Sequence, residues 1–147
     1  MPMEHENYDA LKLENQLCFP LYACAREIVK KYKPFLDEID LTYTQYITMM
    51  VLWEQGRATS KLLGEKLYLD SGTLTPVLKK LEEKALIRRA RDPQDERNLM
   101  VCLTERGEAL KAEAIRVPAQ MAGCVRLSPA DAQALYSLLY RLLDGME

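Results

Sequence analysis

The residues of this sequence best suited to covalent chemistry are its four cysteines, Cys18, Cys24, Cys102 and Cys124. No two of them form a C-x-x-C pair, so a zinc ribbon or another structural metal site is not expected. The single histidine, His5, lies in the polar and acidic N-terminal segment. It leaves no histidine for a Ser-His or Cys-His pair, which disfavours enzymes of that kind. A cysteine of this chain could act as a nucleophile only if its surroundings stabilised the thiolate form.

Cys18 and Cys24 lie in a predicted helix that runs from Leu11 to about Leu36 and that Pro20 is expected to kink. They are separated by about a turn and a half, so the two thiols point to different faces and should not pair within one chain. On residue type alone, a cysteine on such an apolar helix is a buried and inert core residue.

A second group of residues could bind nucleic acid, and it lies within Leu69–Thr104. This segment predicts one helix followed by a tight two-stranded ribbon. Asp70 or Ser71 can cap the helix, and Pro76 is compatible with it only if the cap falls at Ser71 or Gly72. One helix face is apolar, and the other carries side chains that can bond base edges or phosphates in a major groove: Thr73, Thr75 and Lys79.

The ribbon concentrates positive charge in four arginines: Arg88, Arg89, Arg91 and Arg97. An arginine at the ribbon tip can reach a minor groove, whereas Lys84 is expected to meet only solvent or a phosphate. The formal net charge of the chain is -2, so a nucleic-acid surface would have to be a local patch. The alternative is an ordinary helix and hairpin with a solvated surface, because acidic residues offset most of this charge: Glu82, Glu83, Asp92, Asp95 and Glu96.

The remaining segments predict the helices that would position the cysteines and the nucleic-acid-binding residues. Thr42 or Thr44 opens a second helix that ends at Gly56, and Thr59 or Ser60 caps a short third one. Two short helices followed by a basic ribbon are the element order of a winged helix-turn-helix. The predicted fold class is therefore mainly α with a small β-wing. Residues 41–104 form the DNA-binding lobe, and helices at 11–40 and 105–147 form a dimerisation region.

The C-terminal part predicts a helix from Thr104 that is broken or bent at Pro118, and a last helix that Ser128 caps. One side of the last helix is lined by leucines: Leu135, Leu138, Leu139, Leu142 and Leu143. Helices this apolar on a small winged lobe suggest an interface with a second copy. The alternative is that they pack on each other within one chain.

Composition sets further bounds on the function. The chain has 147 residues, of which 48% are hydrophobic and 29% charged, as is typical of one soluble domain. The N-terminus lacks the features of a signal peptide, and the longest apolar run is too short to span a bilayer. We therefore expect a cytoplasmic protein with reduced cysteines and no membrane partner.

The segments DSGTLTPVLKKLEEKALIRR, RDPQDERN and CLTERGEAL resemble the winged-helix core of the MarR family of bacterial transcriptional regulators. The segments LENQLCF and LTYTQY are more specific and resemble the branch that senses organic hydroperoxides, known as OhrR. The resemblance covers nearly the whole chain from about Leu11. It implies a homodimeric repressor without a cofactor, which binds double-stranded operator DNA when reduced and is released by an organic hydroperoxide.

By this resemblance, Cys18 is the peroxide-reacting cysteine, and Tyr22, Tyr32 and Tyr43 are tyrosines whose hydroxyls gather round its sulfur across the dimer. Phenolic O–H donors stabilise a thiolate, which is a physical reason for a lowered cysteine pKa in an apolar pocket. An apolar pocket would favour an organic hydroperoxide over hydrogen peroxide, and its expected members are Phe19, Leu21, Met49 and Met50. This resemblance replaces the inert interpretation of Cys18.

The resemblance also assigns residues to DNA contact. Ser71, Thr73 and Thr75 match positions of the recognition helix. Asp95 and Arg97 match the wing motif in which the acid steadies the arginine over the minor groove.

Cys124 falls close to the place of the second cysteine in relatives that use two, whereas Cys24 and Cys102 match no functional position. Pro20 and Thr44 differ from the residues that are usual at these positions in the family, and both positions bear on the geometry of the sensing pocket.

Two alternative functions remain. The protein could be a regulator of the same family that a small phenolic ligand releases, with Cys18 incidental, or a thiol peroxidase, which would leave the basic wing unexplained.

Overall fold

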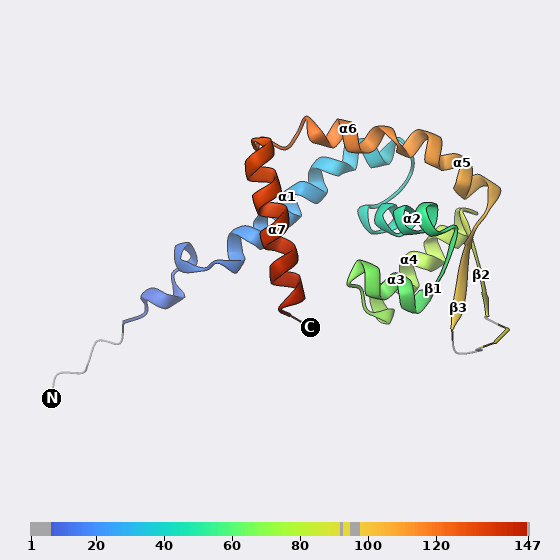
Figure 1. Cartoon of the computed structure of the whole chain (residues 1–147), viewed down its shortest axis with the longest axis horizontal. Helices are drawn as coiled ribbons and strands as arrows, with labels where there is room; N and C mark the ends of the chain where they lie inside the picture. The colour runs from blue at the N-terminus through green and yellow to red at the C-terminus, as the bar shows by residue number, and fades with distance from the viewer. Residues whose placement is uncertain (1–6, 92, 95–97, 147) are drawn as a thin grey trace.

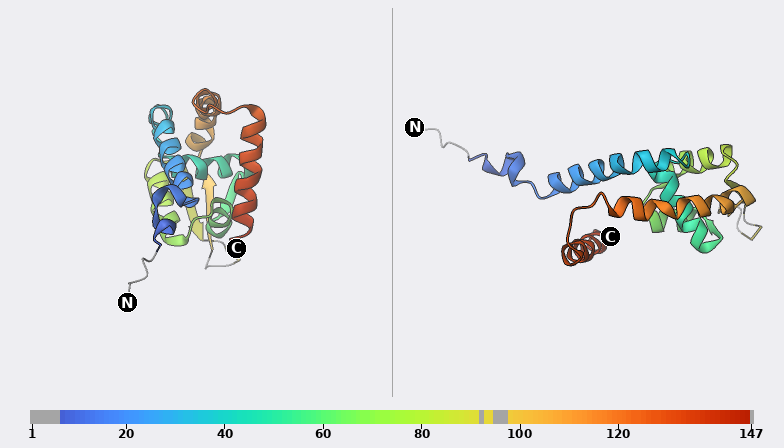
Figure 2. Two further views of the ribbon diagram at one scale, coloured as in Figure 1. Left: turned by 90° about the vertical axis from the view of Figure 1, so that its left-hand side faces the viewer. Right: turned by 90° about the horizontal axis from the view of Figure 1, so that it is seen from above.

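The computed structural model of the chain describes residues 7–91, 93–94 and 98–146. Its elements divide into a winged lobe and flanking helices that extend from it (Figure 1, Figure 2). The winged lobe contains α2 (Tyr43–Gln55), β1 (Arg57–Thr59), α3 (Ser60–Leu67), α4 (Ser71–Glu83), β2 (Ile87–Arg91) and β3 (Leu99–Leu103). The flanking helices are α1 (Cys18–Asp37), α5 (Glu105–Ala114), α6 (Arg116–Ala122) and α7 (Pro129–Asp144). The predicted fold class is confirmed. Within the described residues, every helix is too short or too polar to cross a membrane.

The first long helix begins later than its sequence pattern predicts. Two short 3-10 turns, Asp9–Leu11 and Leu13–Asn15, precede it, and α1 itself starts at Cys18. Pro20 is therefore the third residue of α1, where a backbone N–H has no acceptor within the helix. The expected kink at Pro20 is wrong, because this proline lies in the first turn rather than in the helix interior.

Side-chain caps define where most of the helices start, as predicted. Thr42 forms a full capping box with Gln45 at the start of α2, and Gly56 ends that helix with φ +78°. The other capping side chains each accept from a backbone N–H in the first turn of their helix: Thr59, Asp70, Thr104 and Ser128. These contacts are local, so the sequence is sufficient to specify them.

Helix α4 includes Pro76 although its cap is Asp70, so the requirement for a cap at Ser71 or Gly72 is wrong. The carboxylate of Asp70 accepts from the N–H of Thr73 at 2.7 Å. Pro76 removes only the bond to the carbonyl of Gly72, and Gly72 is exposed, so water can replace that bond. The hydroxyl of Thr75 donates to the carbonyl of Ser71 at 2.6 Å.

The wing is part of a three-stranded antiparallel sheet with the strand order β1-β3-β2. The sequence pattern predicts β2 and β3 and misses β1, because three residues are too few for a periodic signal. Cys102 on β3 lies opposite both Arg57 and Arg88, whereas the next residue in β3 toward the turn, Val101, is buried in the core. Cys102 therefore belongs to the outer face of the sheet.

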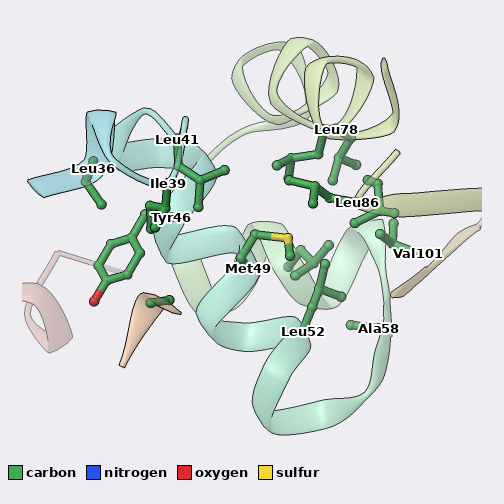
Figure 3. Close-up of a cluster of buried hydrophobic side chains, with 14 of the residues drawn as sticks. Leu36, Ile39, Leu41, Tyr46, Met49, Leu52, Ala58, Leu78, Leu86 and Val101 are labelled. Atoms are coloured by element: carbon green, nitrogen blue, oxygen red, sulfur yellow. The ribbon is translucent and has the colours of Figure 1, made fainter. Parts of the chain in front are cut away.

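The core lies where α2, α4 and the sheet meet (Figure 3). The apolar stripe predicted for α4 faces it, because Leu74, Leu78 and Leu81 are each at most 2% exposed. Helix α5 packs against it closely at Gly107, where an added Cβ would lie 2.1 Å from the carbonyl oxygen of Leu86.

The C-terminal helices lead back from the wing and along α1. The break predicted near Pro118 occurs at Ile115, between α5 and α6, because Pro118 cannot donate to the carbonyl four residues earlier. Helix α6 packs beside α1, as Figure 2 shows from above. Helix α7 follows as a separate arm, and none of its residues, 129–144, is buried.

Candidate functional site

Cys18 is the first residue of α1, and its thiol is free and exposed. Tyr22 lies one turn further along the same helix face. The hydroxyl of Tyr22 accepts a hydrogen bond from Nη1 of Arg26 at 3.1 Å, and the guanidinium also lies 5.6 Å from the ring centroid. The start of α1 therefore combines a thiol, a phenol and a cation on one exposed surface.

Tyr32 and Tyr43 lie together at the other end of α1. Their ring centroids are 4.9 Å apart, and Tyr46 completes the cluster at 5.9 Å from Tyr32 and 6.5 Å from Tyr43. Burial raises the pKa of all three phenols above the usual tyrosine value. They therefore stay protonated at neutral pH and are available as O–H donors. The sequence pattern did not assign Tyr46 to this cluster, although its place three residues after Tyr43 on α2 could have revealed it.

Within one chain Cys18 and this tyrosine cluster are far apart. Cys18 and Tyr32 are separated by fourteen residues of one helix, which corresponds to about 21 Å. The structure thus brings Cys18 near Tyr22 and brings Tyr32 near Tyr43, but one chain does not bring all four predicted residues together.

The predicted apolar pocket is not formed by one chain either. Met49 is 0% exposed and belongs to the core of the winged lobe (Figure 3), whereas Phe19 and Leu21 are exposed at the start of α1. Met50 is also exposed, on α2.

The two departures from the family pattern are compatible with their helices. Pro20 occupies the first turn of α1, as described above. Thr44 is the second residue of α2, where a backbone N–H also has no acceptor within the helix, so a proline or a threonine fits there. Neither residue distorts the elements that carry the tyrosines.

Cys124 lies in the turn between α6 and α7, four residues before the cap Ser128. It is exposed, and its Sγ lies 3.7 Å from the carbonyl oxygen of Gln120. The segment from Cys124 to Ser128 has no helical structure, so Cys124 sits on a connection rather than within a packed element. Cys24 is exposed on α1.

The candidate nucleic-acid surface is the outer side of α4. Thr73, Thr75 and Lys79 are exposed there, as predicted from the helix periodicity, and so is Ser71, which the family resemblance assigned to the recognition helix. A hollow of about 500 Å³ lies beside Ser71 and Thr75, between α3, α4 and the part of the wing near its turn. The hydroxyl and ammonium groups on this helix face can bond base edges or phosphates in a groove of duplex DNA.

The wing arginines differ in their surroundings. Arg88 is exposed on β2, whereas Arg89 is held by Glu82 of α4, with an Nη2 to Oε1 distance of 3.1 Å. The bond to Glu82 occupies one nitrogen of the Arg89 guanidinium and fixes where its other N–H donors lie. The predicted wing pair, Asp95 and Arg97, lies outside the described residues.

Comparisons of sequence agree with this architecture. Residues 30–114 match the family model of the SarA/Rot transcriptional regulators. The chain is 50% identical over 139 residues to the organic hydroperoxide resistance transcriptional regulator of Bacillus subtilis, covering 95% of each protein. It is 43% identical over 127 residues to the HTH-type transcriptional regulator SarZ of Staphylococcus aureus, covering 86% of each.

Comparisons of structure lead to AbfR, a protein of Staphylococcus epidermidis. Reduced AbfR bound to DNA matches with a TM-score of 0.77 at 30% identity, covering 93% of this chain and 95% of AbfR. Overoxidised AbfR bound to DNA gives 0.76 at 31%, covering 93% and 96%. Disulfide-formed AbfR gives 0.64 at 33%, covering 90% and 93%. The present backbone is therefore closer to the DNA-bound forms than to the disulfide form.

Proposed function

Because the chain belongs to the MarR-type winged-helix regulators, in the group that contains the Bacillus subtilis organic hydroperoxide regulator, we propose that it is a redox-sensing repressor. It binds operator DNA as a homodimer when Cys18 is reduced. An organic hydroperoxide oxidises Cys18 and releases the DNA. Its relatives are regulators and not enzymes, and we place its activity in the cytoplasm with the operator DNA.

Two of the flanking helices, α1 and α7, support a homodimer because apolar side chains on them are exposed. On α1 and just before it, Leu17 is 83% exposed, Phe19 42% and Ile28 44%. On α7, Leu135 and Leu138 are 46% and 57% exposed. Two separate helices with apolar faces of this size are typical of an interface with a second copy.

A homodimer also supplies the missing proximity at the sensing site. If the two α1 helices cross in opposite directions, Cys18 of the partner subunit approaches Tyr32 and Tyr43 of this one. The protonated phenols would then donate to the thiolate and stabilise the reactive form. The apolar pocket for the peroxide would likewise be assembled from both chains, with Phe19 and Leu21 contributed by the partner.

The chemistry proposed at Cys18 is a nucleophilic displacement. The thiolate attacks one peroxide oxygen, the S–O bond forms and the O–O bond breaks. The alkoxide leaves and takes up a proton as an alcohol, so Cys18 is oxidised to a sulfenic acid and the peroxide is reduced. The thiolate of Cys124 from the other subunit then attacks this sulfur, a disulfide forms, and the hydroxyl leaves as water after protonation.

Formation of this disulfide requires movement. The two Cα atoms must come within about 7 Å, and the unstructured connection from Cys124 to Ser128 can adjust to allow it. The lower TM-score of disulfide-formed AbfR than of its DNA-bound forms supports a change of backbone on crosslinking in a relative. We infer that the same step here moves the two wings out of register with the DNA.

DNA recognition is assigned to α4 and the wing. Ser71, Thr73, Thr75 and Lys79 face the major groove, with Arg88 on the adjoining strand, while Asp95 and Arg97 act at the wing tip in the minor groove. Two symmetric copies would place their recognition helices about 34 Å apart, one helical turn of DNA, on a pseudo-palindromic site.

The observation that carries this proposal is the position of Cys18, which is free and exposed on an apolar helix that needs a second copy to cover it. The test is a gel-shift titration on the protein's own upstream DNA, with the protein reduced or treated with cumene hydroperoxide. Reduced protein should bind this DNA much more tightly than random duplex, and treatment should release it. Equal binding to both DNAs, or no release of Cys18-oxidised protein, would contradict the proposal.

A further inference from the structure

Lys84, at the C-terminal end of α4, makes contacts that its sequence position does not suggest. Its Nζ donates to the carbonyl oxygen of Asp40 and, at 2.9 Å, to Oε1 of Gln45. The carboxylate of Asp40 lies 3.7 Å away. The Lys84 side chain is only 25% exposed, so the expectation that it meets only solvent or a phosphate is wrong.

The two acceptors of Lys84 lie in the connection between α1 and α2, at Asp40, and in the first turn of α2, at Gln45. Asp40 occupies the turn after α1, with φ +53°, between two buried residues, Ile39 and Leu41 (Figure 3). Gln45 is 6% exposed in the first turn of α2. The end of the recognition helix is therefore tied to the turn that follows the sensing helix.

Gln45 links this contact to the tyrosine cluster. Its Oε1 accepts both from Lys84 and, at 3.1 Å, from the backbone N–H of Thr42, which is the cap of α2. Tyr43 is the next residue after this cap, and its ring packs against that of Tyr32 at an interplanar angle of 50°. A displacement of Tyr43 would thus move the turn that holds the Lys84 acceptors.

We propose that Lys84 is a positioning residue that couples the redox state of Cys18 to the orientation of α4, an inference that rests on the function proposed above. Oxidation of the partner subunit's Cys18 beside Tyr43 shifts the first turn of α2. Hydrogen bonds are directional, whereas apolar contacts in the surrounding core are not, so Lys84 transmits this shift to the end of α4. The recognition helix then leaves its DNA-binding orientation.

The test compares Lys84→Met with Lys80→Met in the full chain. Methionine keeps most of the apolar stem of lysine and removes the charge and the donors. Lys80 is a matched control, since it lies four residues earlier on α4, its side chain is 65% exposed, and it forms a surface ion pair with Glu83. Three quantities are measured for each protein: operator affinity when reduced, operator affinity after cumene hydroperoxide, and the fraction of Cys18 oxidised.

Coupling between sites typically changes affinity about 5- to 150-fold, which sets the range expected for the parent and for Lys80→Met. In Lys84→Met, Cys18 should be oxidised as in the parent, but the ratio of reduced to oxidised affinity should fall at least about threefold. Lys84→Arg, which keeps donors at this position, should restore the ratio. A merely structural role would lower the melting temperature without changing this ratio.

An unchanged ratio in Lys84→Met would overturn the coupling role while leaving the proposed function intact. No release of the oxidised parent would contradict the proposed function itself. If Lys84→Met does not fold, hydrogen exchange of the parent replaces it. Residues 38–45 and 80–86 should then change protection together on oxidation, and a change in only one of these segments would overturn the inference.

Discussion

Arg89 on β2 binds the side chain of Glu82 on α4 through both its backbone and its guanidinium. The backbone N–H donates to Oε2 and Nη2 donates to Oε1, each at 3.1 Å. These two bonds join α4 to the wing, the two elements to which we assign the DNA contacts. Glu82 was expected only to offset positive charge, and the structure instead gives it a defined partner.

This contact predicts a pH-dependent difference in stability. The hydrogen bonds from Arg89 lower the pKa of Glu82 below its usual value. Its contribution is therefore present above the unfolded-state pKa of glutamate, about 4.3, and is lost as the pH falls through the lower folded-state value. Glu82→Gln should have a lower melting temperature than the parent at pH 7, and the difference should shrink on acidification below pH ~4. Glu83→Gln serves as the control, because Glu83 forms an exposed ion pair with Lys80 on the surface of α4. Equal pH profiles for both variants would contradict the prediction.

Removal of one phenol from the cluster should slow sensing. If Tyr43 donates to the thiolate of the partner subunit's Cys18, Tyr43→Phe loses a hydrogen bond to a charged group, which typically contributes about 1.5–3 kcal/mol. The rate of Cys18 oxidation by cumene hydroperoxide, followed by thiol titration, should fall about tenfold or more. Tyr140→Phe changes a phenol on α7 that pairs with Tyr136 instead, and it should react at the parent rate. A normal rate in Tyr43→Phe would remove Tyr43 from the sensing site.

The cysteines should differ in their effect on crosslinking. After stoichiometric cumene hydroperoxide, the parent should form a covalent dimer through Cys18 and Cys124. Cys18→Ser should prevent both the crosslink and DNA release, and Cys124→Ser should stop at the sulfenic acid, which small thiols can capture. Cys24→Ser and Cys102→Ser should behave like the parent. A non-reducing gel with peptide mapping measures this, and a crosslink that contains Cys24 or Cys102 would argue against the mechanism.

Gly107 should be intolerant of a side chain. The Cβ of Gly107→Ala would lie 2.1 Å from the carbonyl oxygen of Leu86, so α5 must shift away from the wing. Overpacking of this kind typically costs about 1–3 kcal/mol in the free energy of unfolding, measured by urea denaturation. At Gly72 the nearest atom to an added Cβ is 3.4 Å away, and Gly72→Ala should keep or raise stability. If Gly107→Ala were more stable than Gly72→Ala, α5 would be able to move away from Leu86 without a loss of stability.

The features that the sequence predicted correctly are those with local causes. Thr42, Thr104 and Ser128 cap helices through bonds to residues three positions away, and the stripe of Leu74, Leu78 and Leu81 follows from helix periodicity alone. Such signals are complete within a short window of sequence.

The features that the sequence patterns missed depend on partners that are distant along the chain. Lys84 bonds to residues about forty positions earlier, and β1 exists because β3 offers it an edge. Tyr46 joins the cluster through Tyr32, which lies on another helix. The sensing site was assigned by family resemblance rather than by pattern, because Cys18 and Tyr32 lie at opposite ends of α1 and come together only in the dimer proposed above.

If α4 enters the major groove as proposed, the bond from the Thr75 hydroxyl to the carbonyl of Ser71 limits the bases that this side chain can contact. With its proton committed to the helix, the hydroxyl oxygen of Thr75 can only accept a further bond. Amino groups at the edges of adenine and cytosine donate such bonds in the major groove, and the thymine methyl can pack against the threonine methyl. Guanine presents only acceptors there. The operator position under Thr75 should therefore disfavour guanine on the contacted strand, a preference encoded by one intrahelical hydrogen bond.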